Sequence, residues 1–257
     1  MNPIISFVKR YPQSVFWTIA YIISGGGYAL SLMYPSDFWP FILWGITLGG
    51  ALVTWIADGG SALKTYFSRM VRFRAGIQWY AVALLTPFAL AFFAYELNIL
   101  TGAEVSEQLP EFGKVAVLFV LFLLTTAAEE PGFRGFSLPR LMQGRSAFTA
   151  SLIIGVLHAI WHLPLYLGGE QGLVDFIYPI CGAFLFTWIF NHTNGSVFVA
   201  MLLHASNDVA GHYFGSAFSG TAVTSYFIWL GVVFVAMAVL LRVFAGSELG
   251  RKQEILK

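Results

Sequence analysis

Charge is scarce in this chain: Asp, Glu, Lys and Arg make up 11% of its 257 residues, and 58% of the residues are hydrophobic. Soluble domains carry about 25% charged residues, so this composition excludes an ordinary soluble globule. It also excludes a disordered chain, which combines low hydrophobicity with high net charge. The composition therefore indicates a membrane protein, whose solvent is lipid.

Cysteine is nearly absent as well. The one cysteine, Cys181, excludes a disulfide framework and any zinc site built from cysteines. It lies in an apolar run, where we expect it to act as a small buried hydrophobic side chain. The formal net charge of +1 gives no sign of a nucleic-acid partner, and we expect none.

Long apolar stretches are abundant, and a transmembrane helix needs about 20 such residues. We therefore predict an all-α polytopic protein with residues 1–257 as a single integral membrane domain. We expect Met1–Arg10 to lie along the membrane surface; a cleaved signal peptide is the alternative for the first span. The eight predicted spans are Val15–Tyr34, Phe38–Ala57, Ile77–Leu97, Val115 to beyond Glu130, Phe148–Leu167, Leu173–Phe190, Ser196–Gly211 and Ala222–Phe244.

The basic residues gather on one side of this topology. If the N-terminus is inside, every Lys and Arg except Lys114 falls in an inner segment, from Lys9 and Arg10 to Lys252 and Lys257. Cytoplasmic loops carry such an excess of Lys and Arg. We therefore predict cytoplasmic N- and C-termini in the inner or cytoplasmic membrane, and a short interfacial helix in the basic loop Asp58–Gly76. Acidic residues collect on the other side: Asp37, Glu96, Glu104, Glu107, Glu111, Glu170 and Asp175.

A few ionisable residues nevertheless fall within the spans. Each costs about 2.5–3.5 kcal/mol on insertion scales, which makes a functional role the default interpretation. If residues 142–146 form the inner turn of a helical hairpin, Glu129 and His162 lie at one depth, and His204 can reach the same layer. This convergence, open to the cytoplasmic side, requires the fourth helix to continue past Pro131. The clusters are Ala127–Arg134, His158–Pro164 and His204–Asp208.

Within each cluster, ionisable residues lie four positions apart, on one helix face. Glu130 and Arg134 are spaced for an ion pair, which leaves Glu129 available for chemistry. His204 is spaced for contact with Asp208, whose carboxylate can fix the imidazole tautomer. His158 has the same spacing from His162; we interpret it as a hydrogen-bonded core histidine, with a ligand role as the alternative.

One carboxylate and two imidazoles in a dry cavity are suited to activating water. Imidazole groups and an Asn amide, here Asn207, can stabilise a developing oxyanion. The same donors, Glu129, His162 and His204, can instead bind a divalent metal such as zinc. The spacing does not separate the metal-dependent reaction from the metal-free one, and we favour a site that requires no cofactor.

The three clusters together resemble the signatures of the CAAX-processing and bacteriocin-processing protease family (CPBP, or Abi). Its Glu-Glu-x-x-x-Arg motif corresponds to Glu129, Glu130 and Arg134. Its Phe-x-x-x-His motif matches at His162, although His158 stands where an aromatic residue is usual. Its His-x-x-x-Asn/Asp motif matches at His204 and Asp208. The resemblance covers a motif-bearing core of about residues 115–212 and implies a CAAX-protease-like core of eight membrane helices.

The resemblance implies an intramembrane endopeptidase that acts on membrane-associated, in some members prenylated, proteins or peptides. Carried over by position, Glu129 and His162 activate water, and His204 and Asp208 stabilise the oxyanion. Glu130, Arg134, His158 and Asn207 are then supporting residues. An ionised Asp208 repels an oxyanion, so it must be protonated, orient His204, or leave the donor role to Asn207.

Two other functions are compatible with the same sequence. A non-proteolytic scaffold or bacteriocin-immunity protein on this fold can use the polar layer to grip a partner helix. A small transporter can use a Glu/His proton relay, although no internal repeat of the kind common in transporters stands out. We favour the peptide hydrolase, because three motifs occur in order within predicted membrane spans.

Overall fold

The computed structural model of the protein describes residues 2–34, 36, 39–169 and 172–251. Asp37, Glu170, Lys252 and Lys257, four residues of the predicted charge pattern, lie outside this part of the chain. Every regular element in the described part is helical. The α-helices are α1 (Pro3–Arg10), α2 (Pro12–Met33), α3 (Trp44–Asp58), α4 (Gly60–Met70), α5 (Ile77–Leu100), α6 (Phe112–Leu124), α7 (Leu138–Met142), α8 (Ala147–Trp161), α9 (Leu163–Gly168), α10 (Ile177–His192), α11 (Val197–Gly215) and α12 (Thr221–Phe244).

Six stretches of the described chain are long and apolar enough to cross a membrane. They correspond to six of the predicted spans, and the all-helical, multi-pass architecture is thereby confirmed. The other two predicted spans correspond to α10 and α11, so the count of eight and the cytoplasmic termini stay predictions. The six stretches are Pro12–Met33, Phe41–Asp58, Ile77–Leu100, Gly113–Met142, Ala147–Gly168 and Thr221–Phe244.

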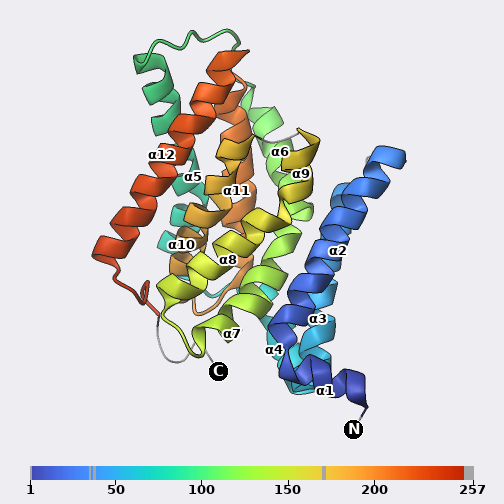
Figure 1. Ribbon diagram of the computed structural model, residues 1–257. Coiled ribbons are helices and arrows are strands. Elements are labelled where there is room, and N and C mark those ends of the chain that lie inside the picture. The colour runs from blue at the N-terminus through green and yellow to red at the C-terminus, as the bar shows by residue number, and fades with distance from the viewer. Residues whose placement is uncertain (1, 35, 37–38, 170–171, 252–257) are drawn as a thin grey trace.

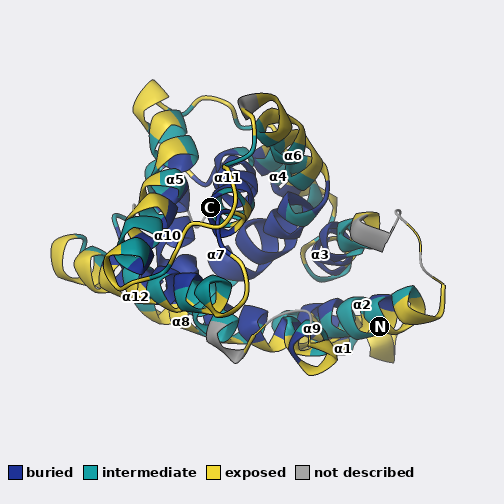
Figure 2. Cartoon of the chain, turned by 90° about the horizontal axis from the view of Figure 1, so that it is seen from above, coloured by how far each residue is buried: buried dark blue, intermediate teal, exposed yellow. Residues whose placement is uncertain are grey.

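Helix α11 forms the centre of the bundle, and it packs against α5, α6 and α10 (Figure 2). Helix α10 in turn packs against α8 and α12, while α2 and α3 form a pair at one side (Figure 1). The buried positions of α11 include His204 and Ser206 among many apolar residues. A central helix with buried polar side chains can carry chemistry that a lipid-facing helix cannot, because lipid offers no hydrogen-bond partner.

The short helices α1 and α4 lie at the end of the bundle that also carries both chain ends (Figure 1). They occupy the predicted surface segment Met1–Arg10 and the predicted helix in the loop Asp58–Gly76. Helix α4 is more than an interfacial helix, because its Tyr66 and Arg69 are buried. The Tyr66 hydroxyl donates to the carbonyl of Thr47 over 2.8 Å. Helix α4 is therefore fastened to the bundle by polar contacts.

The segment after α6 is irregular. It continues as a 3₁₀-helix, η2 (Thr126–Glu129), and a π-helix, η3 (Pro131–Ser137), before α7 begins. The helical path therefore passes Pro131, as the predicted convergence of the polar clusters required. A π-helix is rare and occurs frequently at functional sites. A Cβ atom at Gly132 would lie 2.6 Å from Ile46 Cγ2, so a glycine lets this segment approach α3 closely.

Glycine also sets the spacing of α8 and α10, which gives a first prediction. A Cβ atom at Gly155 would lie 2.7 Å from Ile180 Cα and 2.9 Å from its carbonyl oxygen, both backbone atoms that cannot move aside. Gly155→Ala should therefore push the helices apart and destabilise the protein by about 1–3 kcal/mol, seen as a lower thermal midpoint in detergent.

The matched control is Gly182→Ala in α10. Its Cβ atom would lie 3.6 Å from Phe234 Cε1, an ordinary contact, and alanine favours a helix by about 1 kcal/mol over glycine. We expect an unchanged or higher midpoint. Equal midpoints for the two variants would show that the α8–α10 contact does not depend on Gly155.

Candidate active site

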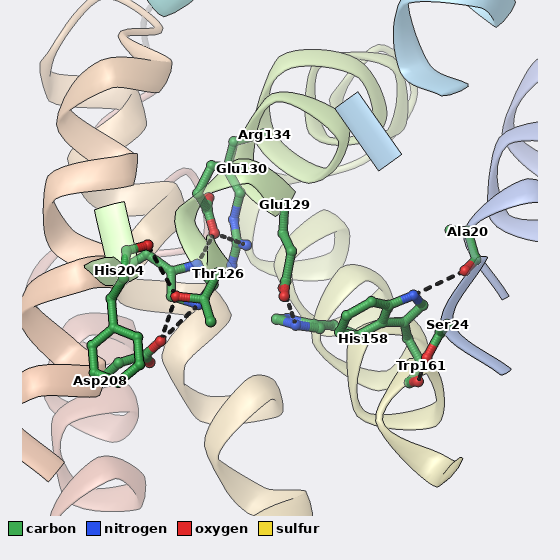
Figure 3. Close-up of polar contacts among 11 residues, drawn as sticks. Ala20, Ser24, Thr126, Glu129, Glu130, Arg134, His158, Trp161, His204 and Asp208 are labelled. Carbon is green, nitrogen blue, oxygen red and sulfur yellow. Dashed lines mark hydrogen bonds and ion pairs between the residues drawn. The ribbon is translucent and has the colours of Figure 1, made fainter. Parts of the chain in front are cut away.

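Two adjacent glutamates form the middle of the polar layer. Glu129 ends η2 and Glu130 precedes η3; their side chains are 3% and 0% exposed. Figure 3 shows Glu129 directed toward His158 and Glu130 toward Arg134 and His204. The change from 3₁₀- to π-helical backbone lies between them, and the two carboxylates therefore serve two separate groups of partners.

The first group contains Glu129, His158 and His162. Glu129 Oε2 lies 3.1 Å from His158 Nε2, and one donor atom from each of the three residues lies within 4.8 Å of the others. Three atoms so placed share a point no more than about 2.8 Å from each, which is hydrogen-bond distance for water. One water molecule can therefore contact the carboxylate and both imidazoles.

The second group surrounds Glu130. Its Oε1 accepts from Arg134 Nη1 over 2.9 Å, as the spacing predicted, and lies 2.7 Å from His204 Nδ1. The Arg134 side chain is 2% exposed, and its guanidinium carbon lies 4.2 Å from the centre of the Phe186 ring. A carboxylate at Nδ1 fixes the His204 tautomer with a proton on that nitrogen. Glu130 therefore orients His204 and compensates Arg134.

Asp208 completes this second group from one turn along α11. Its Oδ2 lies 3.7 Å from His204 Nε2 and accepts from the Thr126 hydroxyl over 2.7 Å. Thr126 precedes the glutamate pair in η2, and no signal in the sequence marked it. The hydroxyl ties the carboxylate of Asp208 to the glutamate segment, which places Asp208 beside His204 without a direct hydrogen bond between them.

A cavity of about 330 Å³ adjoins both groups. Its polar wall comes from Arg134, His158, His162, His204, Asn207 and Asp208. The rest of the wall is largely apolar and aromatic, from Tyr178, Phe186, Phe227, Leu230 and Phe234. A polar layer at one wall of an apolar cavity is the usual form of a ligand site.

The direction of this cavity differs from one expectation. The polar layer was predicted to open toward the cytoplasmic side, which the predicted topology places at the end of the bundle that carries α1 and α4 (Figure 1). Lining residues instead follow α11 from His204 to His212 and reach Asp175 before α10. His212 and Asp175 lie toward the opposite end of the bundle. Helix α11 runs away from the turn at Asn194, so His212 is far from that turn, and α10 runs toward the turn, so Asp175 before it is far away as well (Figure 1).

The histidines are also grouped differently from the predicted set of Glu129, His162 and His204. His204 contacts Glu130, and His158 takes its place beside Glu129. His158 was interpreted as a core histidine, although its spacing from His162 was the signal that kept a ligand role open. The residues that can hold a metal ion are therefore Glu129, His158 and His162, the group of this kind found in the described part of the chain.

This trio fits a zinc ion only in part. One carboxylate and two imidazoles are the protein ligands of many catalytic zinc sites. A zinc-bound histidine almost always donates its second ring N–H to an acceptor, which fixes the ring. His158 Nδ1 is buried, and no described residue offers it a hydrogen-bond partner. The first coordination shell is present, but no described residue supplies the supporting contact at His158.

Comparison with known proteins identifies the segment that carries this site. Residues 111–210 match the family described as Type II CAAX prenyl endopeptidase Rce1-like. This segment is therefore similar to an Rce1-like domain. It contains all three polar clusters, from Glu129 to Asp208, and both groups described above.

Two curated proteins resemble more of the chain. A CAAX prenyl protease 2 from Methanococcus maripaludis is 24% identical over 227 residues, which cover 79% of this chain and 81% of the relative. A Lysostaphin resistance protein A from Staphylococcus haemolyticus is 22% identical over 168 residues, which cover 63% of this chain and 44% of that protein. Together with the Rce1-like domain, the first relative supports the predicted class of enzyme, a peptide hydrolase.

The two glutamates of the Rce1-like domain should differ in their effect on stability. Glu130→Gln removes the charge that compensates buried Arg134, and breaking a buried pair costs about 3–5 kcal/mol. Glu129→Gln leaves no buried arginine uncompensated and keeps a polar group beside His158. We expect a much lower thermal midpoint for Glu130→Gln than for Glu129→Gln, measured in the same detergent. Equal midpoints would contradict the assignment of Glu130 as the partner of Arg134.

Proposed function

We propose that the protein is an intramembrane endopeptidase in the cell (inner or cytoplasmic) membrane, with residues 1–257 as one membrane domain. The observation that carries this proposal is the buried trio of Glu129, His158 and His162, whose donor atoms can share one water molecule. An imidazole–carboxylate set beside a cavity is suited to peptide hydrolysis, because the reaction requires one group that accepts a proton from water and later returns it.

The substrate is a membrane-associated protein or peptide. The cavity beside the trio lies within the helical bundle and is lined by several aromatic rings, so a substrate reaches it from the lipid phase or along its apolar wall. A prenylated segment is one such substrate, and the relative named CAAX prenyl protease 2 supports it. An apolar anchor also concentrates the scissile bond at the depth of the site.

The water molecule is activated by Glu129 together with His162, and His158 orients Glu129 through their contact of 3.1 Å. The water oxygen attacks the carbonyl carbon of the scissile bond, while its proton moves to the activating pair. The resulting tetrahedral intermediate carries negative charge on the former carbonyl oxygen. The stored proton then passes to the leaving nitrogen as the C–N bond breaks, which yields a carboxylic acid and an amine. The acid proton then moves to the amine, and the products leave as carboxylate and ammonium.

The developing oxyanion is stabilised from α11. As an imidazolium, His204 donates its Nδ1 proton to Glu130 and presents its Nε2 proton to the cavity near Asp208. Asp208 accepts from Thr126, which supports a positioning role for its carboxylate. Asn207 also lines the cavity and offers an amide N–H₂, a donor that bears no repelling charge. Donors aimed at the position where charge develops are typically worth several kcal/mol.

No metal is required in this scheme. A divalent ion such as zinc, held by Glu129, His158 and His162, would supply Lewis-acid activation of the water. The missing second contact of His158 supports the metal-free reaction.

Glu129→Gln provides the direct test. The amide cannot accept a proton, so cleavage of a membrane-anchored peptide by the purified protein should fall by about 10²–10⁴-fold. Glu104→Gln, in the exposed loop after α5, is the matched control and should cleave at the wild-type rate. Chelator should leave the wild-type rate unchanged. Loss of activity on chelation, restored by zinc, would contradict the metal-free scheme, and full activity of Glu129→Gln would contradict the proposal itself.

Asn207 and Asp208 should respond differently to substitution. Asn207→Ala removes a proposed oxyanion donor, so kcat should fall by about 10²-fold with little change in KM. Asp208→Asn keeps the size and can still accept from Thr126, so it should retain most of the activity. The reverse order, measured with one peptide substrate, would assign the donor role to position 208.

A second candidate function is a non-proteolytic immunity or scaffold protein. The similarity to a protein named Lysostaphin resistance protein A favours it. Such a protein uses the cavity to hold a partner helix, so Glu129→Gln should preserve a protective effect in cells. A protective effect that is lost with Glu129→Gln and kept with Glu104→Gln supports the peptidase.

A further inference from the structure

A second cavity lies at the other end of the bundle, beside the start of α2 (Figure 1). Its volume is about 380 Å³, and it lies between α2, α3, α4 and α7. Much of its wall is polar, in contrast to the first cavity. The polar lining residues are Gln13, Thr54, Asp58, Thr65, Tyr66, Arg69, Arg140 and Gln143.

Positive charge predominates among the described residues of this cavity wall, which include two arginines, Arg69 and Arg140, and one carboxylate, Asp58. Arg69 is buried, and Arg140 forms an ion pair with the half-exposed Asp58. Burial, followed by the positive charges of Arg72 and Arg140, lowers the pKa of Arg69 to about 10. The guanidinium groups therefore repel one another, and an anion between them would relieve that repulsion.

Both arginines also hold the π-helix. Arg69 Nη1 donates to the carbonyl of Gly135 and Arg140 Nη1 to that of Phe136, each over 3.0 Å. Gly135 directly follows Arg134, the partner of Glu130. The carbonyl group that Arg69 binds therefore belongs to the residue next to Arg134, so a ligand of Arg69 is connected through Gly135 to the ion pair of the candidate active site.

The position of the cavity brings it close to lipid headgroups. Pro12 and Gln13, at the start of α2, form part of its wall, and α1 directly precedes them. Helix α1 exposes Ile4 and Phe7 and ends with Lys9 and Arg10. A helix with apolar and basic faces lies in the membrane interface, where anionic lipids attract it.

We propose that this cavity binds a phosphate group, carried either by an anionic phospholipid or by a soluble phosphate ester. Arginine is suited to this task, because its planar guanidinium donates two parallel hydrogen bonds to phosphate oxygens. Tyr66 already donates to Thr47 and Gln13 to Ser137, so Arg69, Arg140 and the amide of Gln143 are the principal donors. Binding would fasten α4 to the π-helix and stabilise the fold without any contact with a peptide substrate.

The test compares Thr65→Glu with Thr65→Gln. Thr65 lines the cavity, and its hydroxyl donates only to the carbonyl of Ser61 within α4 among the bonds of the described residues, so either substitution removes the same local contact. Glutamate and glutamine have the same size, and the two variants therefore differ from each other by one negative charge. Protein in a neutral detergent is titrated with phosphatidylglycerol, with phosphatidylcholine of the same chains, and with glycerol 1-phosphate. Native mass spectrometry counts the bound molecules, and the thermal midpoint reports stabilisation. Both readouts are independent of peptidase activity.

We expect the wild type and Thr65→Gln to bind phosphatidylglycerol more tightly than phosphatidylcholine, and Thr65→Glu to bind phosphatidylglycerol about fivefold more weakly. Binding of glycerol 1-phosphate alone, with the same loss in Thr65→Glu, supports the site and identifies a soluble ligand. Failure of the wild type to bind either anion, or equal binding by the two variants, overturns the proposal. Gln143→Glu, at an exposed position of the wall, repeats the comparison with wild type if Thr65→Glu does not fold.

Discussion

The buried guanidinium of Arg134 constrains the rest of the site. A charge in a membrane-embedded bundle needs a partner, and Arg134 has Glu130 at 2.9 Å and the face of Phe186 beside it. Glu130 also contacts His204, so one carboxylate joins the glutamate segment to α11. Once that carboxylate is occupied, its neighbour Glu129 is directed to a different set of residues. Glu130 therefore has a structural role, and Glu129 is available for the reaction that we propose.

The irregular backbone between α6 and α7 makes this division possible. In a regular helix, the angle between consecutive side chains is fixed at about 100°. Here a 3₁₀ segment ends at Glu129 and a π segment begins at Pro131, so the two carboxylates reach α8 and α11 respectively. Arg69 and Arg140, which bind carbonyl groups of the π segment, extend the same network to the second cavity.

Much of this arrangement could be predicted from local spacing and from the cost of charge in lipid. The helical architecture and the Glu130–Arg134 pair followed from those two principles, and the passage of the helix beyond Pro131 was the condition that the predicted convergence required. The addition of His158 to the Glu129 and His162 group did not, because His158 lies near the end of α8 and His162 caps that helix, whose rotation depends on packing against α10. The burial of Arg69 and the direction of the cavity also depend on contacts between distant segments.

The central claim is that Glu129 and His162 act on the same water molecule. The most direct measurement is a double-mutant comparison of kcat/KM for Glu129→Gln, His162→Ala and the combined variant, with one membrane-anchored peptide. Residues that act as a unit are strongly non-additive, so the combined variant should be no slower than the slower single variant. Losses that multiply in the combined variant would contradict a shared water and assign the two residues to independent steps.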